Sequence, residues 1–229
     1  MINLLNIYNE LLKKYGYQGW WPLFSFKGVN PTKTGSIKGY HPRDYFIVKN
    51  DSQRFEISVG AILAQNTNWV NAEKSLLNLI NNNLLSPEKI INNIKKVKEL
   101  IKPSNYFNIK SGYLVNFSNF FLKLKGKIPK REELLSIKGI GKETADSILL
   151  YAYNNPVFII DAYTKRLINH LGLIDSNDYE IIRAFFENNL PKNYELFSEF
   201  HALIVEHAKN YYSKKPYGLN DFLKKINKK

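Results

Sequence analysis

The sequence predicts an all-α protein. Apolar residues recur at intervals of three and four along most of the chain, which is the spacing of one buried helical face. Hydrophobic residues make up 44% of the 229 residues, enough to build a packed core. One segment, at about 23–54, departs from the helical spacing. A chain of this length forms one large domain or two small lobes that share a core.

The first helices are expected on either side of that segment. From residue 4 to 15, one buried face is made by Leu4, Leu5, Tyr8, Leu11, Leu12 and Tyr15. Gly16 and Gly19 then interrupt the pattern. Two further helical faces follow the segment, at Phe55, Val59, Ile62 and Leu63 and at Trp69, Ala72, Leu76 and Ile80.

The segment at about 23–54 is rich in residues that break helices. It contains Gly28, Pro31, Gly35, Gly39 and Pro42, together with β-prone residues at 45–48. This composition predicts an insertion that forms either a β-hairpin or a basic loop.

The second half of the chain is again helical in pattern. Ser86 is expected to cap a helix whose first turn contains Pro87. Three later helical faces are made by Ala145, Ile148, Leu149 and Ala152, by Leu167, Ile168 and Leu171, and by Phe197, Phe200, Ile204 and His207.

Charge and cysteine content narrow the class of function. The 33 Lys and Arg residues exceed the 20 acidic residues, which gives a formal charge of +13 at pH 7. Such a surplus favours a polyanionic partner, nucleic acid first, although a lysine-rich proteome produces the same composition. The chain has no cysteine, which excludes disulfides, zinc–thiolate sites and cysteine-ligated iron–sulfur clusters.

No targeting or membrane segment is apparent in the sequence. The N-terminus lacks a charged stretch followed by an apolar run, and no stretch approaches the roughly 20 apolar residues of a membrane span. We therefore expect a soluble protein with no membrane partner, located in the cytoplasm and associated with the nucleoid.

The most informative segment is residues 134–145, LLSIKGIGKETA. Gly139-Ile140-Gly141 joins an apolar run to a new helix, and glycine lets the backbone approach a ligand closely. Free N–H groups at the helix start form an anion site, to which Lys138 and Lys142 add positive charge. A phosphodiester is the expected occupant. An ordinary helix-turn-helix with glycine in its turn is the alternative.

This segment resembles the hairpin of the helix-hairpin-helix (HhH-GPD) DNA glycosylases, the endonuclease III superfamily. The resemblance implies binding to DNA through Lys138, Gly139, Ile140, Gly141, Lys142 and Thr144. A monovalent cation, Na⁺ or K⁺, is also expected at the hairpin, where carbonyl groups can bridge it to phosphate. No other cofactor is expected.

Asp161 occupies the place of the superfamily's aspartate, after a hairpin, a helix and the apolar run at 157–160. Cleavage of an N-glycosidic bond builds positive charge on the deoxyribose, which a fixed carboxylate stabilises while it orients the attacking water. Asp161 is therefore the expected catalytic residue. A helix N-cap is the structural alternative, and the two roles are compatible.

Glu143 stands where bifunctional members of the superfamily carry the lysine that forms a Schiff base. Lys142 lies about 100° around the helix and is expected to face phosphate. Efficient AP lyase activity is therefore not expected. The sequence also lacks the four cysteines with which endonuclease III binds an iron–sulfur cluster.

The chain is most similar to the iron–sulfur-free 3-methyladenine DNA glycosylases of this superfamily. The similarity runs through residues 19–22, 59–69, 102–108, 139–146 and 200–206, with the insertion at 23–54 as the main departure. It implies a base pocket of Trp20, Trp21, Trp69 and Lys209. It also implies that Gln65 fills the gap left by the extruded base while Tyr106 wedges the opposite strand. Core packing is the alternative for the tryptophans, and a solvated surface position is the alternative for Gln65 and Lys209.

The resemblance implies an all-α, two-lobe fold. A central helical lobe at 55–165 carries the hairpin, while residues 1–54 and 166–229 form an N/C-terminal lobe with the basic insertion. The expected function is hydrolysis of alkylated purines, of the 3-methyladenine type, from double-stranded DNA by a monomer. Two alternatives are a glycosylase/AP lyase acting on oxidised or mismatched bases, and a hairpin protein that binds DNA without catalysis.

Overall fold

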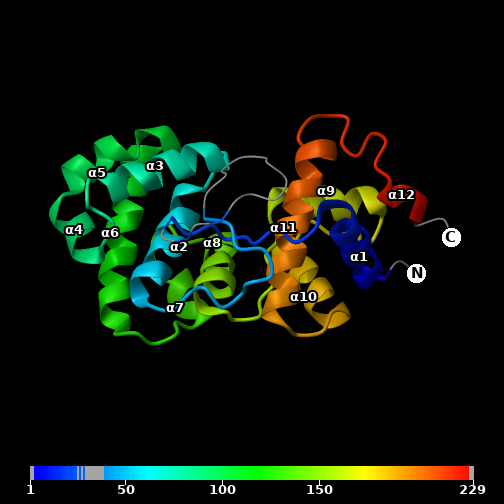
Figure 1. Ribbon diagram of the computed structural model, residues 1–229, viewed down its shortest axis with the longest axis horizontal. Helices are drawn as coiled ribbons and strands as arrows, with labels where there is room; N and C mark the ends of the chain where they lie inside the picture. Colours follow the sequence, from blue (N-terminus) through cyan, green and yellow to red (C-terminus); the bar gives the residue numbers. More distant parts are fainter. Residues whose placement is uncertain (1–2, 25, 27, 29–38, 227–229) are drawn as a thin grey trace.

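The computed structural model describes residues 3–24, 26, 28 and 39–226, and every regular element within them is a helix (Figure 1). The all-α prediction is confirmed. None of the described helices has the length and apolar character that crossing a membrane requires.

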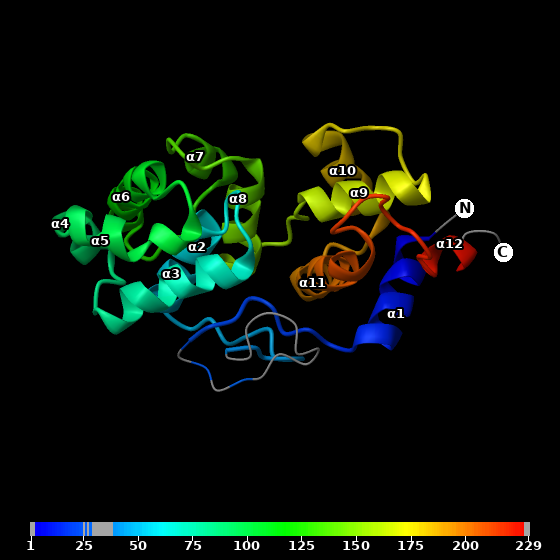
Figure 2. The same cartoon turned by 90° about the horizontal axis from the view of Figure 1, so that it is seen from above.

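The helices form two groups that lie side by side (Figures 1 and 2). One group contains α2 (Asp51–Leu63), α3 (Trp69–Asn81), α4 (Pro87–Asn92), α5 (Ile94–Leu100), the 3₁₀ turn η1 (Lys102–Ser104), α6 (Phe107–Leu124), α7 (Arg131–Leu135), α8 (Lys142–Ser147) and the π-helical turn η2 (Ile148–Ala152). The other contains α1 (Leu4–Tyr15), α9 (Ala162–Leu171), α10 (Tyr179–Asn189), α11 (Tyr194–Tyr211) and α12 (Leu223–Ile226).

Two segments connect the groups, and their described residues form no regular element. One runs from the end of α1 to the start of α2, and the other runs from η2 to α9. The proposed lobe boundaries, after residues 54 and 165, fall inside α2 and α9, a few residues from these connections. The second connection ends at Asp161, so this carboxylate lies where the two groups meet.

Local signals in the sequence locate the helix ends well. Asn3 caps α1, and Gly16, at φ 70°, ends it. Ser86 caps α4 with Pro87 in its first turn, as expected. Helix α2 begins four residues earlier than its first expected apolar residue, because the Asn50 side chain accepts a hydrogen bond from the N–H of Gln53 and caps the helix at Asp51.

The described part of the insertion forms no strand, so the expected β-hairpin character is not seen there. The β-prone residues 45–48 are irregular and stay close to α11 through the Tyr45 hydroxyl, which donates to Glu199 over 2.7 Å. Two backbone hydrogen bonds, from Leu23 to Gly39 and from His41 to Gly19, join the ends of the loop. The expected loop residues 29–38 lie outside the described residues.

Candidate active site

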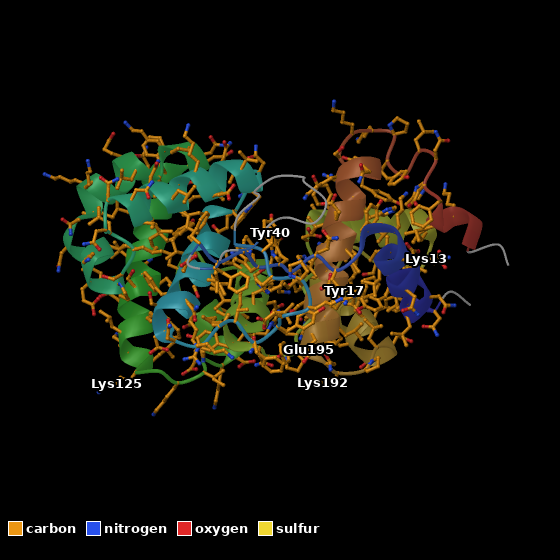
Figure 3. The ribbon with its side chains drawn as sticks, in the orientation of Figure 1. Lys13, Tyr17, Tyr40, Lys125, Lys192 and Glu195 are labelled. Carbon is orange, nitrogen blue, oxygen red and sulfur yellow. The ribbon has the colours of Figure 1, made fainter. Side chains whose placement is uncertain are left out.

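A cavity of about 440 Å³ opens where the two groups of helices meet. Its walls come from the segment before the insertion, the turn between α2 and α3, the start of α8, the end of the second connection, and α11. Tyr40, labelled in Figure 3, lies near the middle of the molecule and also lines it. All four residues expected in the base pocket line this cavity, namely Trp20, Trp21, Trp69 and Lys209.

The three tryptophans form one aromatic cluster. The centroid of the Trp69 ring lies 4.7 Å from the centroid of the Trp20 ring and 5.1 Å from that of the Trp21 ring, and both pairs pack edge to face. The rings therefore touch one another, and no gap between two parallel rings is held open for a base. Trp21 is only 6% exposed, and its indole packs so tightly on Gly60 that a Cβ there would lie 3.2 Å from it.

The segment that carries Trp20 and Trp21, residues 16–24, has no regular structure and is held by side chains from elsewhere. We call it the strap. Glu199 of α11 accepts a hydrogen bond of 2.6 Å from the N–H of Gln18. His41 lies 2.8 Å from the carbonyl oxygen of Trp21. Trp20 and Trp21 are thus positioned by a contact to α11 before them and by a contact to His41 at Trp21 itself.

Asp161 is the N-cap of α9. Its Oδ1 accepts hydrogen bonds from both the N–H and the hydroxyl of Thr164, each at 2.7 Å. Its Oδ2 lies 3.9 Å from Nε2 of His201. The capping role and the position in the cavity wall occur together, so one carboxylate oxygen is fixed while the other faces the cavity side.

Glu143 lies beside Asp161 at the entrance of the cavity. Its side chain is accessible to solvent, but many protein atoms surround it in the concave site. Loss of hydration in this setting raises its pKa to about 7, and the negative charge of Asp161 acts in the same direction, while Lys165 opposes it. The carboxyl group therefore exchanges protons near neutral pH.

The remaining charged residues of the cavity are Lys209 and Glu206. The Lys209 Nζ contacts Glu206 Oε2 at 2.9 Å, and Glu206 is buried. Three carboxylates, from Glu143, Asp161 and Glu206, thus line the cavity with one lysine. The cavity of this basic protein is acidic.

The hairpin lies in front of a second hollow, of about 830 Å³, which it lines with residues 139–144. Gly139 has φ 103°, and a Cβ there would overlap the ring of Tyr113 at 2.2 Å, so only glycine fits. At Gly141 a Cβ would meet nothing within 4 Å. Within the described residues, the N–H groups of Gly141, Lys142 and Glu143 have no hydrogen-bond partner.

Residues expected to contact DNA fall into two sets. Lys138 and Lys142 are exposed, whereas the side chains of Ile140 and Thr144 are buried. Lys142 lies 3.3 Å from Glu180 of α10. The side chains of this buried pair line the hollow but are only 5% and 7% exposed, so a ligand there meets mainly the backbone.

The two residues expected to enter the DNA differ in their resting state. The Gln65 amide donates to the Gly139 carbonyl over 2.9 Å and to the Thr144 hydroxyl over 3.0 Å, so it is bound to the hairpin. Tyr106 is 63% exposed and has a left-handed backbone, at φ 45°. Such a conformation in a non-glycine residue is typical of functional positions.

The side chains that could ligate a metal are spread apart among the described residues. These residues contain no group of three or more His, Asp or Glu side chains that could hold a metal, and the chain has no cysteine for a cluster. Hairpin carbonyls of Lys138 and Gly139 already accept hydrogen bonds from the Asn116 and Gln65 amides. The monovalent cation stays a prediction.

Sequence patterns do not reveal the part played by two residues that line the cavity, Gln18 and Glu206, or by Tyr151 behind it. Glu206 precedes Lys209 by three residues, a spacing typical of helical ion pairs, which could have indicated their contact. Gln18 and Tyr151 carry no comparable signal, because their partners on α11 are far away in the chain.

Comparison with known proteins gives a consistent result. Residues 59–192 match the HhH-GPD superfamily of base excision DNA repair proteins. The protein MJ1434 of Methanocaldococcus jannaschii, whose name describes it as a candidate DNA repair glycosylase, is 40% identical over 93% of this chain and 90% of its own length. Endonuclease III of Thermotoga maritima is 25% identical over 68% of this chain and 73% of its own length.

Solved structures show the same likeness. The structure of H. pylori 3-methyladenine DNA glycosylase (MagIII) bound to 1,N6-ethenoadenine superposes with a TM-score of 0.69 and 28% identity, covering 91% of this chain and 98% of that one. A trapped covalent complex of endonuclease III with DNA has the same TM-score at 15% identity, covering 95% and 91% of the two chains.

Proposed function

Because the chain belongs to the HhH-GPD superfamily of base excision DNA repair proteins, we propose that it hydrolyses the N-glycosidic bond of alkylated purines in double-stranded DNA. Membership of this family, together with the similarity to these relatives, shows that the chain is a base excision repair DNA glycosylase and that it acts on DNA. We further propose that alkylated purines are the substrates, that Asp161 is the catalytic residue, and that the enzyme is monomeric and lacks AP lyase activity.

The acidic aromatic cavity is the observation that supports this substrate class most. A purine alkylated at N3 or N7 carries a positive charge, which three indole rings attract through cation–π contact. Asp161 adds electrostatic attraction in the same cavity, as does Glu143 when it is ionised, while the charge of Glu206 is shared with Lys209. A neutral base gains neither interaction to the same extent. The related MagIII has been solved with 1,N6-ethenoadenine bound, a neutral purine adduct, so that structure supports a purine-sized pocket and not the preference for positive charge.

Asp161 is proposed to stabilise the sugar as the bond breaks. The electron pair of the C1′–N bond leaves with the base, which neutralises an alkylated purine and removes the need for a strong general acid. The deoxyribose becomes positively charged, and Oδ2 of Asp161 stabilises this charge and orients the water that attacks C1′, while the proton that this water loses passes to solvent. The Thr164 contacts hold the carboxylate in place.

The hairpin is proposed to hold the DNA backbone while the base leaves the helix. The unpartnered N–H groups at Gly141, Lys142 and Glu143 suit a phosphate, and Lys138 adds charge. Gln65 must release Gly139 and Thr144 before it can fill the gap in the duplex, whereas the exposed Tyr106 needs no such release.

The catalytic assignment is tested with Asp161→Asn. Asparagine also caps helices, so the fold should persist while the negative charge is lost. We expect release of 3-methyladenine in single-turnover assays to fall at least about 100-fold, with the Kd for an abasic-site duplex changed little. Thr164→Ser, which keeps the hydroxyl, is the matched control. Normal release by the Asn variant would refute the assignment.

The substrate class is tested on duplexes that each contain one lesion. Cationic 3-methyladenine and 7-methylguanine should be released faster than neutral 1,N6-ethenoadenine, 8-oxoguanine or thymine glycol. If an oxidised base is the best substrate, the proposed class is wrong.

The monofunctional assignment is tested by borohydride trapping on an abasic-site duplex, with an endonuclease III as the positive control. Because Glu143 replaces the lysine, no covalent adduct should form. A strong adduct would show that another amine of this chain acts as a lyase nucleophile.

A further inference from the structure

His201 of α11 is a buried histidine in the cavity wall, 7% exposed. Its Nδ1 lies 2.8 Å from the hydroxyl of Tyr151, and its Nε2 lies 3.9 Å from Oδ2 of Asp161. Within the described residues, Nε2 is buried and has no hydrogen-bond partner. A buried nitrogen left unpaired costs stability, which favours a role in another state of the site.

The charge of Asp161 selects which ring nitrogen carries the proton. The Tyr151 hydroxyl lies 2.8 Å from His201 Nδ1 and can donate to it or, over 3.4 Å, to the Ser198 carbonyl oxygen, so these two contacts fit either tautomer. With the proton on Nδ1, the Nε2 lone pair would face the Asp161 carboxylate at 3.9 Å, which is electrostatically unfavourable. We therefore place the hydrogen on Nε2, with Nδ1 accepting from the Tyr151 hydroxyl.

The imidazole is neutral in this setting. Burial lowers the pKa of His201, and the nearby Asp161 charge opposes that shift only in part. Burial also raises the pKa of the Tyr151 hydroxyl well above its usual value, as do the charges of Glu199 and Asp161, so the hydroxyl keeps its proton. The Tyr151 hydroxyl thus donates to Nδ1 while Nε2–H faces Asp161. This arrangement requires only a neutral histidine.

The Asp161 carboxylate is fixed on one side only. Oδ1 has both Thr164 donors, whereas the contact from Oδ2 to His201 is about 1 Å too long for a hydrogen bond. Catalytic contacts often tighten only when the substrate is bound. A small rotation of the carboxylate would bring Oδ2 onto Nε2–H and define the plane of the carboxylate.

We propose that His201, oriented by Tyr151, is a positioning residue that donates its Nε2–H to Oδ2 of Asp161 in the reactive state. This inference rests on the proposed role of Asp161. The hydrogen bond would hold the carboxylate in one orientation toward C1′, so its loss should slow bond cleavage without weakening the grip on DNA.

The tautomer can be measured without any activity assay. ¹⁵N NMR of the imidazole nitrogens, with Tyr151→Phe to assign the His201 signal among the four histidines, should show a proton on Nε2 near neutral pH. A proton on Nδ1 would overturn the proposal, whatever base the enzyme releases.

The kinetic test compares His201→Gln with His201→Phe. Glutamine can place an amide N–H near the position of Nε2, whereas phenylalanine keeps a ring without a donor. We expect His201→Phe to lower the single-turnover rate of 3-methyladenine release about 10- to 100-fold, with the Kd for an abasic duplex within about 2-fold. His201→Gln should recover most of the rate. Equal losses in both variants, or none, would overturn the proposal.

A double-mutant cycle separates this inference from the proposed function. In an Asp161→Asn background, His201→Phe should cause no further loss, because the histidine acts through the carboxylate. An additional loss of the same size would show an independent role. If Asp161→Asn alone is fully active, the catalytic assignment and the His201 inference both fail. If only the released base differs from expectation, the substrate class fails and the same variants are measured on that base.

Discussion

The two glycines of the hairpin, Gly139 and Gly141, are required by different physical constraints. Gly139 has a left-handed backbone and the Tyr113 ring where its Cβ would be, so its constraint is internal to the fold. Gly141 has an ordinary φ of −90° and open space at the Cβ position. The space beside Gly141 is what a phosphate needs in order to reach the N–H groups of the helix start.

This difference predicts opposite outcomes for two identical substitutions. Gly139→Ala should lower the free energy of unfolding by about 2 kcal/mol or more, because of backbone strain and overlap with Tyr113. Gly141→Ala should leave stability within about 0.5 kcal/mol but weaken binding of an abasic duplex about 10-fold. Urea denaturation and fluorescence anisotropy measure the two quantities. Unchanged DNA affinity in Gly141→Ala would contradict the phosphate site.

Much of the site at residue scale could be predicted from the sequence. Asp161 as a helix cap and the joint presence of Trp20, Trp21 and Trp69 in one cavity both follow the expected pattern. The resting contacts of Gln65 and the contact of His201 with Tyr151 could not be predicted. They join residues 50 to 79 positions apart, and pairing at that distance depends on how the helices pack.

At the scale of elements, an ion-pair network centred on the buried Asp146 connects the hairpin to the other group of helices. Arg131 of α7 makes two hydrogen bonds to Asp146 of α8, at 2.6 and 3.0 Å, and one to Glu180 of α10. The Tyr179 hydroxyl also donates to Asp146 over 2.8 Å. Asp146 is fully buried, so these donors take the place of the water that would otherwise hydrate its carboxyl group.

Removing this carboxylate should therefore be costly. Asp146→Ala leaves the Arg131 guanidinium without its main partner, and the free energy of unfolding should fall by about 3 kcal/mol. Glu132→Ala, at an exposed position on the same α7, should change it by less than about 0.5 kcal/mol. Urea denaturation of both variants provides the comparison. Equal losses would mean that the network adds no stability.

Helix α6 shows where sequence patterns fail at this scale. Its apolar residues are spread around the helix, and several of them, such as Ile109 and Leu122, are exposed. The buried residues recur at intervals of three and four, but Lys110, Ser111 and Ser118 are among them, so apolar residues alone do not mark this face. Its buried Lys110 instead contacts the carbonyl oxygens of Leu63 and Ser104, which join α6 to the ends of α2 and η1.

At the scale of the whole molecule, buried carboxyl groups make stability depend on pH. Burial raises the pKa of Glu56 in α2 to about 7, from 4.5 in the unfolded chain, although the Phe24 N–H donates to it. The folded state therefore binds the proton more tightly. This contribution to stability is complete below pH 4.5 and is lost as the pH rises to about 7.

Glu56→Gln should remove this loss, since an amide never ionises and can still accept the hydrogen bond. The free energy of unfolding of the variant, relative to that of the wild type, should therefore increase steadily between pH 4.5 and 7, by up to about 3 kcal/mol. Urea denaturation across that range tests the effect, with Glu132→Gln as the exposed control. A difference that does not change with pH would contradict the assigned burial.

The strap has a consequence for how such an enzyme can diversify. The strap carries two of the three indoles but has no secondary structure, and it is held by the side chains of Glu199, His41 and Glu56 and by two backbone hydrogen bonds to residues 39 and 41. The hairpin and Asp161 belong to helices and the connection between them. Substitutions in the strap can therefore reshape the pocket while the scaffold and its carboxylate are inherited unchanged. Related chains with the same hairpin could in this way acquire different damaged bases as substrates, one short segment at a time.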